Sequence, residues 1–200
     1  DAFSLTTLER REFFALAAEV AEEQAVNPTH NPQQIREQVD EVINGIHLPC
    51  FVYDDYFDVV AANHASLVLH GIPSAWLQKL MDEYGTANFL HVIFAQDSPM
   101  RQSMARNWPA LAQGNISQFR AMSLRHRHTA RFAALFTRLS KQPNFLDVWS
   151  STQHTYSDFA SRMRTHRYQH PVYGILFYAV FAVTSYSAQN HLHVTALLPL

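Results

Sequence analysis

The chain contains few of the residues that would mark a disulfide-bonded, membrane-spanning or catalytic protein. It has one cysteine, five glycines and 200 residues, and its longest strongly apolar run, Ile175–Val183, is nine residues long. Cys50 alone cannot form an internal disulfide, and a membrane-spanning helix needs ~20 apolar residues. No Gly-x-Ser-x-Gly, His-Glu-x-x-His or phosphate-binding glycine motif is found. We therefore expect a cytoplasmic, non-enzymatic protein without a membrane partner.

Acidic residues are missing from one long stretch. Residues 98–146 contain seven arginines and one lysine but no aspartate or glutamate, whereas residues 1–45 carry nine acidic residues against three arginines. These opposite charges favour contact between the two segments, within one chain or between two copies. The alternative is a solvated basic face without a partner. Direct nucleic-acid binding by the basic segment is not favoured, because no DNA-binding motif accompanies the charges.

Two helices are expected before the first strand. Thr6 and Glu9 have the spacing of a capping box, which predicts the start of a helix. Asn31 and Pro32 suit the cap and the first position of a second helix, which Gly45 ends. We expect residues 1–45 to form a helical linker and dimerisation segment of a homodimer, and residues 46–200 to form the main domain.

The main domain combines strands at both ends with helices between them. Two β-branched and aromatic runs, residues 48–53 and 56–63, flank the acidic pair Asp54-Asp55 and predict a hairpin. Helical patterns then continue to about residue 154. Strand-like runs follow at residues 163–168, 173–186 and 191–198. This order predicts an α+β fold, in which one antiparallel sheet joins distant parts of the chain and a large helical insert covers one face.

Several short segments match one family in order and spacing over nearly the whole chain. They are Leu8-Glu9-Arg10 with Phe14–Ala17, Pro49–Tyr53 with Phe57–Asn63, Asn88–Phe94 with Asp97, Arg101 with Trp108, Arg120, Phe132–Leu139 with Phe145 and Trp149, and Arg167–Gly174. With these segments the chain resembles the MmyB-like ligand-binding domain, a PAS-like sensor that follows an XRE-type helix-turn-helix in bacterial transcription regulators.

The resemblance implies a function and a set of partners. It implies a PAS-like fold with a ligand cavity between sheet and helices, and an apolar small-molecule ligand such as a fatty acid. It also implies DNA binding through an upstream helix-turn-helix domain that is not in this chain. No cofactor is expected other than such a bound fatty acid. Ligand binding would shift the two leading helices by favouring one arrangement over another.

Large apolar side chains are the candidate ligand contacts. Each of them alone is more simply a core residue, but together they can line an elongated cavity between two layers. The set is Phe51, Trp76, Phe89, Phe94, Trp108, Phe119, Met122, Phe132, Phe136 and Phe177.

Arg120 is the candidate anchor for a ligand carboxylate. Ile116 and Leu124 lie four residues to either side, so Arg120 belongs to a partly apolar helix face, and its planar guanidinium can bind a carboxylate through two donors. The alternative is an arginine that extends to solvent or donates to carbonyl groups at a helix end. Arg101 is predicted to pair with Asp97 near a helix start.

The twelve histidines support a competing hypothesis. His126-x-His128, His191-x-His193 and His166 contain imidazoles that could gather at one site. The chain would then be a metal- or haem-dependent sensor or a small enzyme that uses its histidines.

Overall fold

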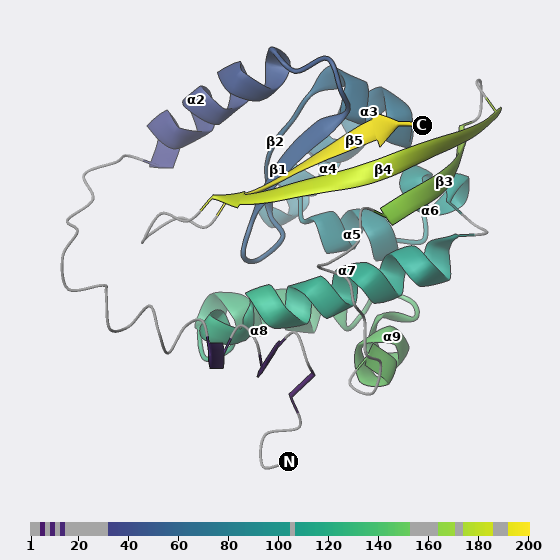
Figure 1. Cartoon of the computed structure of the whole chain (residues 1–200). Coiled ribbons are helices and arrows are strands. Elements are labelled where there is room, and N and C mark those ends of the chain that lie inside the picture. Colours follow the sequence, from purple (N-terminus) through teal and green to yellow (C-terminus); the bar gives the residue numbers. More distant parts are fainter. Residues whose placement is uncertain are drawn as a thin grey trace.

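The fold class expected from the sequence is confirmed. The computed structural model describes residues 5–6, 9–10, 13–14, 32–104, 107–152, 164–170, 174–185 and 192–200. Its centre is a five-stranded antiparallel sheet with the order β2-β1-β5-β4-β3, and a helical insert covers one face of this sheet (Figure 1). The division between residues 45 and 46 stays a prediction.

The sheet is closed by strands from distant parts of the chain, as predicted. Phe51 in the first strand pairs with Thr195 in the last, and the last strand also pairs with the long fourth strand. The strands are β1 (Cys50–Asp54), β2 (Val59–Ala62), β3 (Arg164–His170), β4 (Gly174–Ser185) and β5 (Leu192–Pro199).

The β1–β2 connection is an irregular hairpin around the acidic pair. The register shifts between Val52 and Tyr53, so the hairpin contains a bulge. Asp54 fixes the turn, because its Oδ1 accepts hydrogen bonds from the backbone nitrogens of Tyr56 (2.9 Å) and Asp58 (3.0 Å).

The insert consists of short helices that begin and end at local signals. Asn63, Asn88 and Thr129 each accept a backbone hydrogen bond at a helix start, and Gly71 and Gly85 end helices with positive φ angles. The helices are α3 (His64–His70), α4 (Ser74–Tyr84), α5 (Phe89–Phe94), α6 (Pro99–Ser103), α7 (Trp108–Met122), the 3₁₀ turn η2 (Leu124–His126), α8 (Ala130–Leu139) and α9 (Phe145–Ser151).

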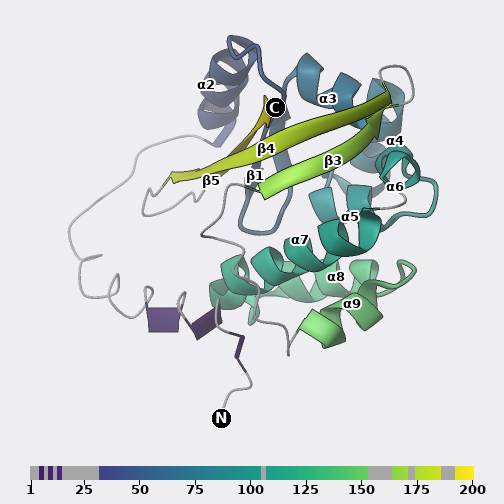
Figure 2. The ribbon, with the colours of Figure 1, turned by 45° about the vertical axis from the view of Figure 1, so that its right-hand side comes forward.

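Helix α7 is the central helix of the insert. Figure 2 shows it between the sheet and the pair formed by α8 and α9. Nine of its fifteen residues are buried, including polar ones such as Asn115 and Ser117. A helix that is buried on most sides contacts two different layers. Its side chains therefore belong to two different environments.

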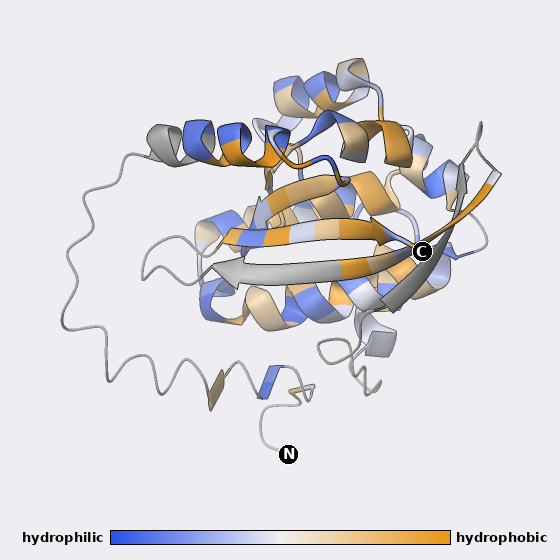
Figure 3. Ribbon diagram, turned by 45° about the horizontal axis from the view of Figure 1, so that its top comes forward, coloured by the Kyte–Doolittle hydropathy of each residue, from blue (hydrophilic) through white to orange (hydrophobic). Residues whose placement is uncertain are grey.

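Helix α2 (Pro32–Asn44) packs on the opposite face of the sheet from the insert. Ile43, 2% exposed, lies in a small core with Cys50, Val52 and Ala61. Figure 3 shows hydrophobic residues at the end of α2 that lies next to the strands. Among the described helices, none has the length and apolar character of a membrane span.

Candidate functional site

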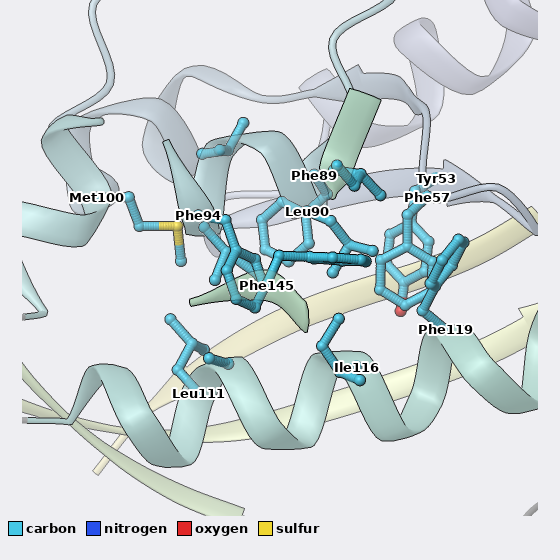
Figure 4. Close-up of a cluster of buried hydrophobic side chains, with 14 of the residues drawn as sticks. Tyr53, Phe57, Phe89, Leu90, Phe94, Met100, Leu111, Ile116, Phe119 and Phe145 are labelled. Atoms are coloured by element: carbon cyan, nitrogen blue, oxygen red, sulfur yellow. The ribbon is translucent and has the colours of Figure 1, made fainter. Parts of the chain in front are cut away.

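An aromatic layer lines the helix-facing side of β1. Phe51 and Phe89 have ring centroids 4.7 Å apart, and Phe57 lies 4.7 Å from Tyr53. All four residues are buried. Figure 4 shows Tyr53, Phe57 and Phe89 close together at one end of the apolar cluster. Two residues of the predicted set, Phe51 and Phe89, therefore belong to the interface between sheet and insert.

Five more residues of the predicted set form a second part of the same core, between the helices. Phe94 contacts Trp108 at 5.4 Å, and Phe132 lies 5.9 Å from both Phe119 and Phe136. These contacts bring the five residues together from α5, α7 and α8. Phe119 also lies 5.4 Å from Phe57, which joins this part to the layer at the sheet.

Besides Tyr53 and Phe57, two further contacts of this core were absent from the predicted set. Phe145 is fully buried and lies 5.3 Å from Phe94, while Trp149 lies 5.0 Å from Phe136. Both stand on α9 (Figure 4 labels Phe145). Both residues belong to the segments through which the sequence resembles the family. This resemblance was the signal that could have identified them.

Trp76 and Met122 lie at the border of the core. Both are partly buried and pack against it. Trp76 also donates a hydrogen bond from Nε1 to Oδ2 of Asp97 at 3.4 Å. Each therefore combines an apolar contact with some access to solvent.

Phe177 does not lie with the other nine apolar candidates. It is 48% exposed, whereas its neighbours Leu176 and Tyr178, together with Val180, are partly buried against the core. Successive strand residues point to opposite faces, so Phe177 lies on the face away from the insert. Its placement with the other candidates was wrong, because the apolar run 175–183 has no alternation that would reveal its inner face.

Arg120 is buried and points away from the sheet. Gln118 on the same helix donates from Nε2 to the Tyr53 hydroxyl at 2.8 Å, so position 118 faces the sheet. Residues two positions apart on a helix point in directions that differ by about 200°. Arg120, 3% exposed, accordingly lies over the ring of Trp149, with Cζ 4.6 Å from the centroid. The Arg120 side chain therefore neither contacts the aromatic layer at the sheet nor extends to solvent.

The guanidinium group of Arg120 is bound to a carboxylate of the chain itself. Glu9 is fully buried, and its Oε1 lies 3.1 Å from Nη2 of Arg120. Arg127 donates from Nη2 to the same oxygen, and the backbone nitrogen of Thr6 donates to Oε2 at 2.7 Å. The backbone nitrogen of Glu9 donates to the Thr6 hydroxyl at 3.2 Å, which confirms the capping box.

The charges around Glu9 favour its ionised form. Burial alone would raise the pKa of this carboxyl, but the hydrogen bonds from Arg127 and Thr6, with the charge of Arg127, outweigh burial and lower the pKa below its ordinary value. The expected attraction between the acidic leading segment and the basic segment is thus confirmed at this contact.

Arg101 has partners other than the predicted one. It donates to the carbonyl of Phe94 at 2.6 Å and to Oδ1 of Asn144 at 2.9 Å, and its Cζ lies 4.4 Å from the Trp108 ring centroid. Asp97 instead lies 3.6 Å from Nζ of Lys79. The predicted pairing with Asp97 was wrong.

Two histidines from the proposed metal pairs meet at one aspartate. Nε2 of His193 lies 2.8 Å from Oδ1 of Asp55, and Nε2 of His126 lies 3.0 Å from Oδ2. Within the described ranges, no group of three or more histidine, cysteine, aspartate or glutamate residues is arranged to hold a metal ion. His191 and the side chain of His166 lie outside the described residues.

The fold combines an antiparallel sheet with a helical layer around an apolar core. Residues 35–200 match the model of the MmyB-like transcription regulator ligand binding domain. The chain therefore belongs to this family and contains the ligand-binding domain of a transcription regulator, as the resemblance indicated. A comparison with curated proteins gives no match. Glu9 precedes the matched range, whereas Arg120 and Arg127 lie within it.

Proposed function

We propose that this domain is a non-catalytic sensor that binds an apolar small molecule, such as a fatty acid, between β4 and the helical insert. The observation that carries the proposal is the inner face of β4. Leu176, Tyr178 and Val180 pack against the aromatic core but remain only partly buried. The described side chains thus leave apolar surface accessible where strand and insert meet, and such surface favours an apolar ligand.

An acyl chain gains enough free energy from such a surface to bind without catalytic groups. Each methylene transferred from water contributes about 0.8 kcal/mol, so a tail of about ten methylenes contributes roughly 8 kcal/mol. Lost translational and side-chain freedom offsets part of this gain. Affinity in the micromolar range is the expected result.

Regulation requires that the ligand prefer one of two arrangements of the protein. A ligand with equal affinity for both would shift nothing, however tightly it bound. In the proposed setting the protein is a cytoplasmic homodimer, and DNA is bound by an upstream helix-turn-helix domain. Residues 1–45 would transmit the preference of the ligand to that domain.

The binding site is tested with two aspartate substitutions on adjacent residues of β4. Leu176→Asp places a charge on the face toward the insert, and Ile175→Asp places the same charge on the opposite face, where Ile175 is 46% exposed. Decanoate is titrated against each protein in competition with a fluorescent fatty acid. We expect Leu176→Asp to weaken binding by about tenfold or more and Ile175→Asp to leave it unchanged.

Equal binding by both variants would contradict the proposed face, and no binding by the unsubstituted protein would contradict the ligand class. Circular dichroism establishes that each variant is folded, and Leu176→Asn serves as a milder substitution. Denaturing extraction with mass analysis identifies any molecule that co-purifies. An acyl compound supports the proposal, whereas stoichiometric zinc or iron without an organic ligand supports the histidine-based alternative.

A further inference from the structure

The arginine pair around Glu9 has more donors and more positive charge than one carboxylate satisfies. Arg120 and Arg127 both bind Glu9, so the three groups together carry one net positive charge. The Nε atoms of both arginines are buried and have no hydrogen-bond partner among the described residues. Buried N–H donors of a charged group are normally satisfied, so these atoms point to an acceptor.

The site is built by the domain and not by the segment that carries Glu9. Arg127 is held by its own hydrogen bond from Nη2 to the carbonyl of Arg120 at 2.6 Å. Trp149 covers the Arg120 guanidinium, whose Nη1 lies 3.5 Å from the Trp149 carbonyl. The two guanidinium groups are therefore positioned by α7, the following turn and α9. Glu9 supplies only the anion.

We propose that Arg120 and Arg127 form a carboxylate-binding site, that Glu9 is its intramolecular occupant, and that a free carboxylate competes with Glu9. The ligand class is a small monocarboxylate. A planar guanidinium suits a carboxylate geometrically, and the ring of Trp149 offers an apolar surface to the group attached to it. The site faces α9, on the side of α7 away from the sheet, so the inference does not depend on the apolar ligand proposed at β4.

Competition at this site would control the position of the leading segment. A buried guanidinium without a counter-ion is strongly unfavourable, so release of Glu9 is favoured when another anion replaces it. Glu9 precedes the family-matched range, and the carboxylate site lies within that range. Free carboxylate and the docked leading segment therefore exclude each other, which connects an anion concentration to the contact between residue 9 and the domain.

The first test uses Glu9→Ala and measures thermal unfolding in sodium acetate, with sodium chloride at the same ionic strength as reference. We expect the unfolding temperature of Glu9→Ala to rise saturably with acetate and to exceed its rise with chloride. The unsubstituted protein and Glu41→Ala, an exposed substitution on α2, should show a much smaller acetate-specific rise, because acetate must first displace Glu9. An equal response of Glu9→Ala to both salts overturns the proposal.

Two further variants keep this test decisive. Glu9→Gln retains the shape of the side chain without its charge, and it replaces Glu9→Ala if the latter does not fold. In the double variant Glu9→Gln/Arg127→Gln the acetate response should disappear. If the response persists there, acetate acts elsewhere on the protein and the assignment of this site is wrong.

The second test follows release of the leading segment by tryptic cleavage after Arg10, the residue next to Glu9. Acetate should accelerate this cleavage in the unsubstituted protein, and Glu9→Gln should be cleaved rapidly with or without acetate. Chloride serves again as the salt reference. If acetate leaves the cleavage rate of the unsubstituted protein unchanged while Glu9→Gln is cleaved rapidly, free carboxylate does not compete with Glu9 and the inference fails.

The outcome is separable from that of the proposed acyl-binding function. Decanol has a similar tail but no carboxylate, so its binding reports on the apolar site alone. Decanol binding without an acetate effect leaves the proposed function standing and overturns the carboxylate site. An acetate effect without binding of decanol or decanoate supports the carboxylate site and contradicts the proposed acyl-binding function.

Discussion

The side-chain amide nitrogen of Asn63 donates a hydrogen bond to the carbonyl oxygen of Leu48 at 2.7 Å. The same nitrogen lies 2.9 Å from the carbonyl oxygen of Ile46. The side-chain Oδ1 of Asn63 accepts hydrogen bonds from the backbone nitrogens of Cys50 at 3.0 Å and Ser66 at 2.9 Å. One buried side chain thus joins the loop before β1, the first residue of β1 and the first turn of α3.

Asn63→Asp should destabilise the protein by about 3 kcal/mol, because a carboxylate would face the carbonyl oxygens that now accept from the amide. Urea denaturation measures the free energy of unfolding. Gln38→Glu is the control, because it makes the same amide-to-acid change at an exposed position on α2. A loss within about 0.5 kcal/mol of the control would show that the donor role of Asn63 contributes little.

Local signals were enough to predict most elements of this fold. The three last strands lie at Arg164–His170, Gly174–Ser185 and Leu192–Pro199, each within two residues of the strand-like runs. The capping box at Thr6 and Glu9 forms as expected. These features depend on hydrogen bonds and side-chain shapes within a few residues, so the sequence contains them directly.

The site was predicted less completely, because it depends on contacts between distant residues. Arg120 was placed on an apolar face by its spacing from Ile116 and Leu124, but α7 is buried on most sides, so spacing alone could not select the layer it faces. Its partner Glu9 lies 111 positions away. The inner face of β4 was similarly hidden, because both of its faces carry apolar residues.

Phe57 combines full burial with a backbone conformation that suits glycine. Its φ angle is 64°, and it packs against Phe119 and Tyr53. Loss of the ring in Phe57→Ala or Phe57→Gly should cost about 3–5 kcal/mol. The left-handed conformation costs a residue with a β-carbon roughly 1–2 kcal/mol, which glycine avoids. Phe57→Gly should therefore be no less stable than Phe57→Ala in urea denaturation.

Phe119 is the control for this comparison, because it is also fully buried but lies within α7. Glycine in a helix is about 1 kcal/mol less favourable than alanine, so Phe119→Gly should be the less stable of its pair. If both positions showed the same order, with alanine more stable, the backbone at Phe57 would not be strained.

His91 should make the protein less stable as the pH falls below about 6.5, the ordinary pKa of histidine. It is 6% exposed on α5, its ring lies 4.9 Å from Tyr84, and Nδ1 has no hydrogen-bond partner among the described residues. Burial, and secondarily the charge of Arg138, lower the pKa of His91 below 6.5. The unfolded chain then binds a proton that the folded protein does not, so acid favours unfolding.

The free energy of unfolding should be level above this pH and fall below it, by at most about 1.4 kcal/mol per pH unit for one histidine, until the folded-state pKa is reached. Urea denaturation between pH 8 and 5 measures this slope above the range in which Glu9 contributes. The pKa of Glu9 is lowered in the folded protein, so its contribution is lost only as the pH falls below the ordinary glutamate value of about 4.3 in the unfolded chain. His91→Leu should flatten the profile, whereas Gln38→Leu, which replaces an exposed side chain on α2 that does not titrate, should leave it unchanged. If the slope of His91→Leu equals that of the unsubstituted protein, the acid sensitivity originates at other groups.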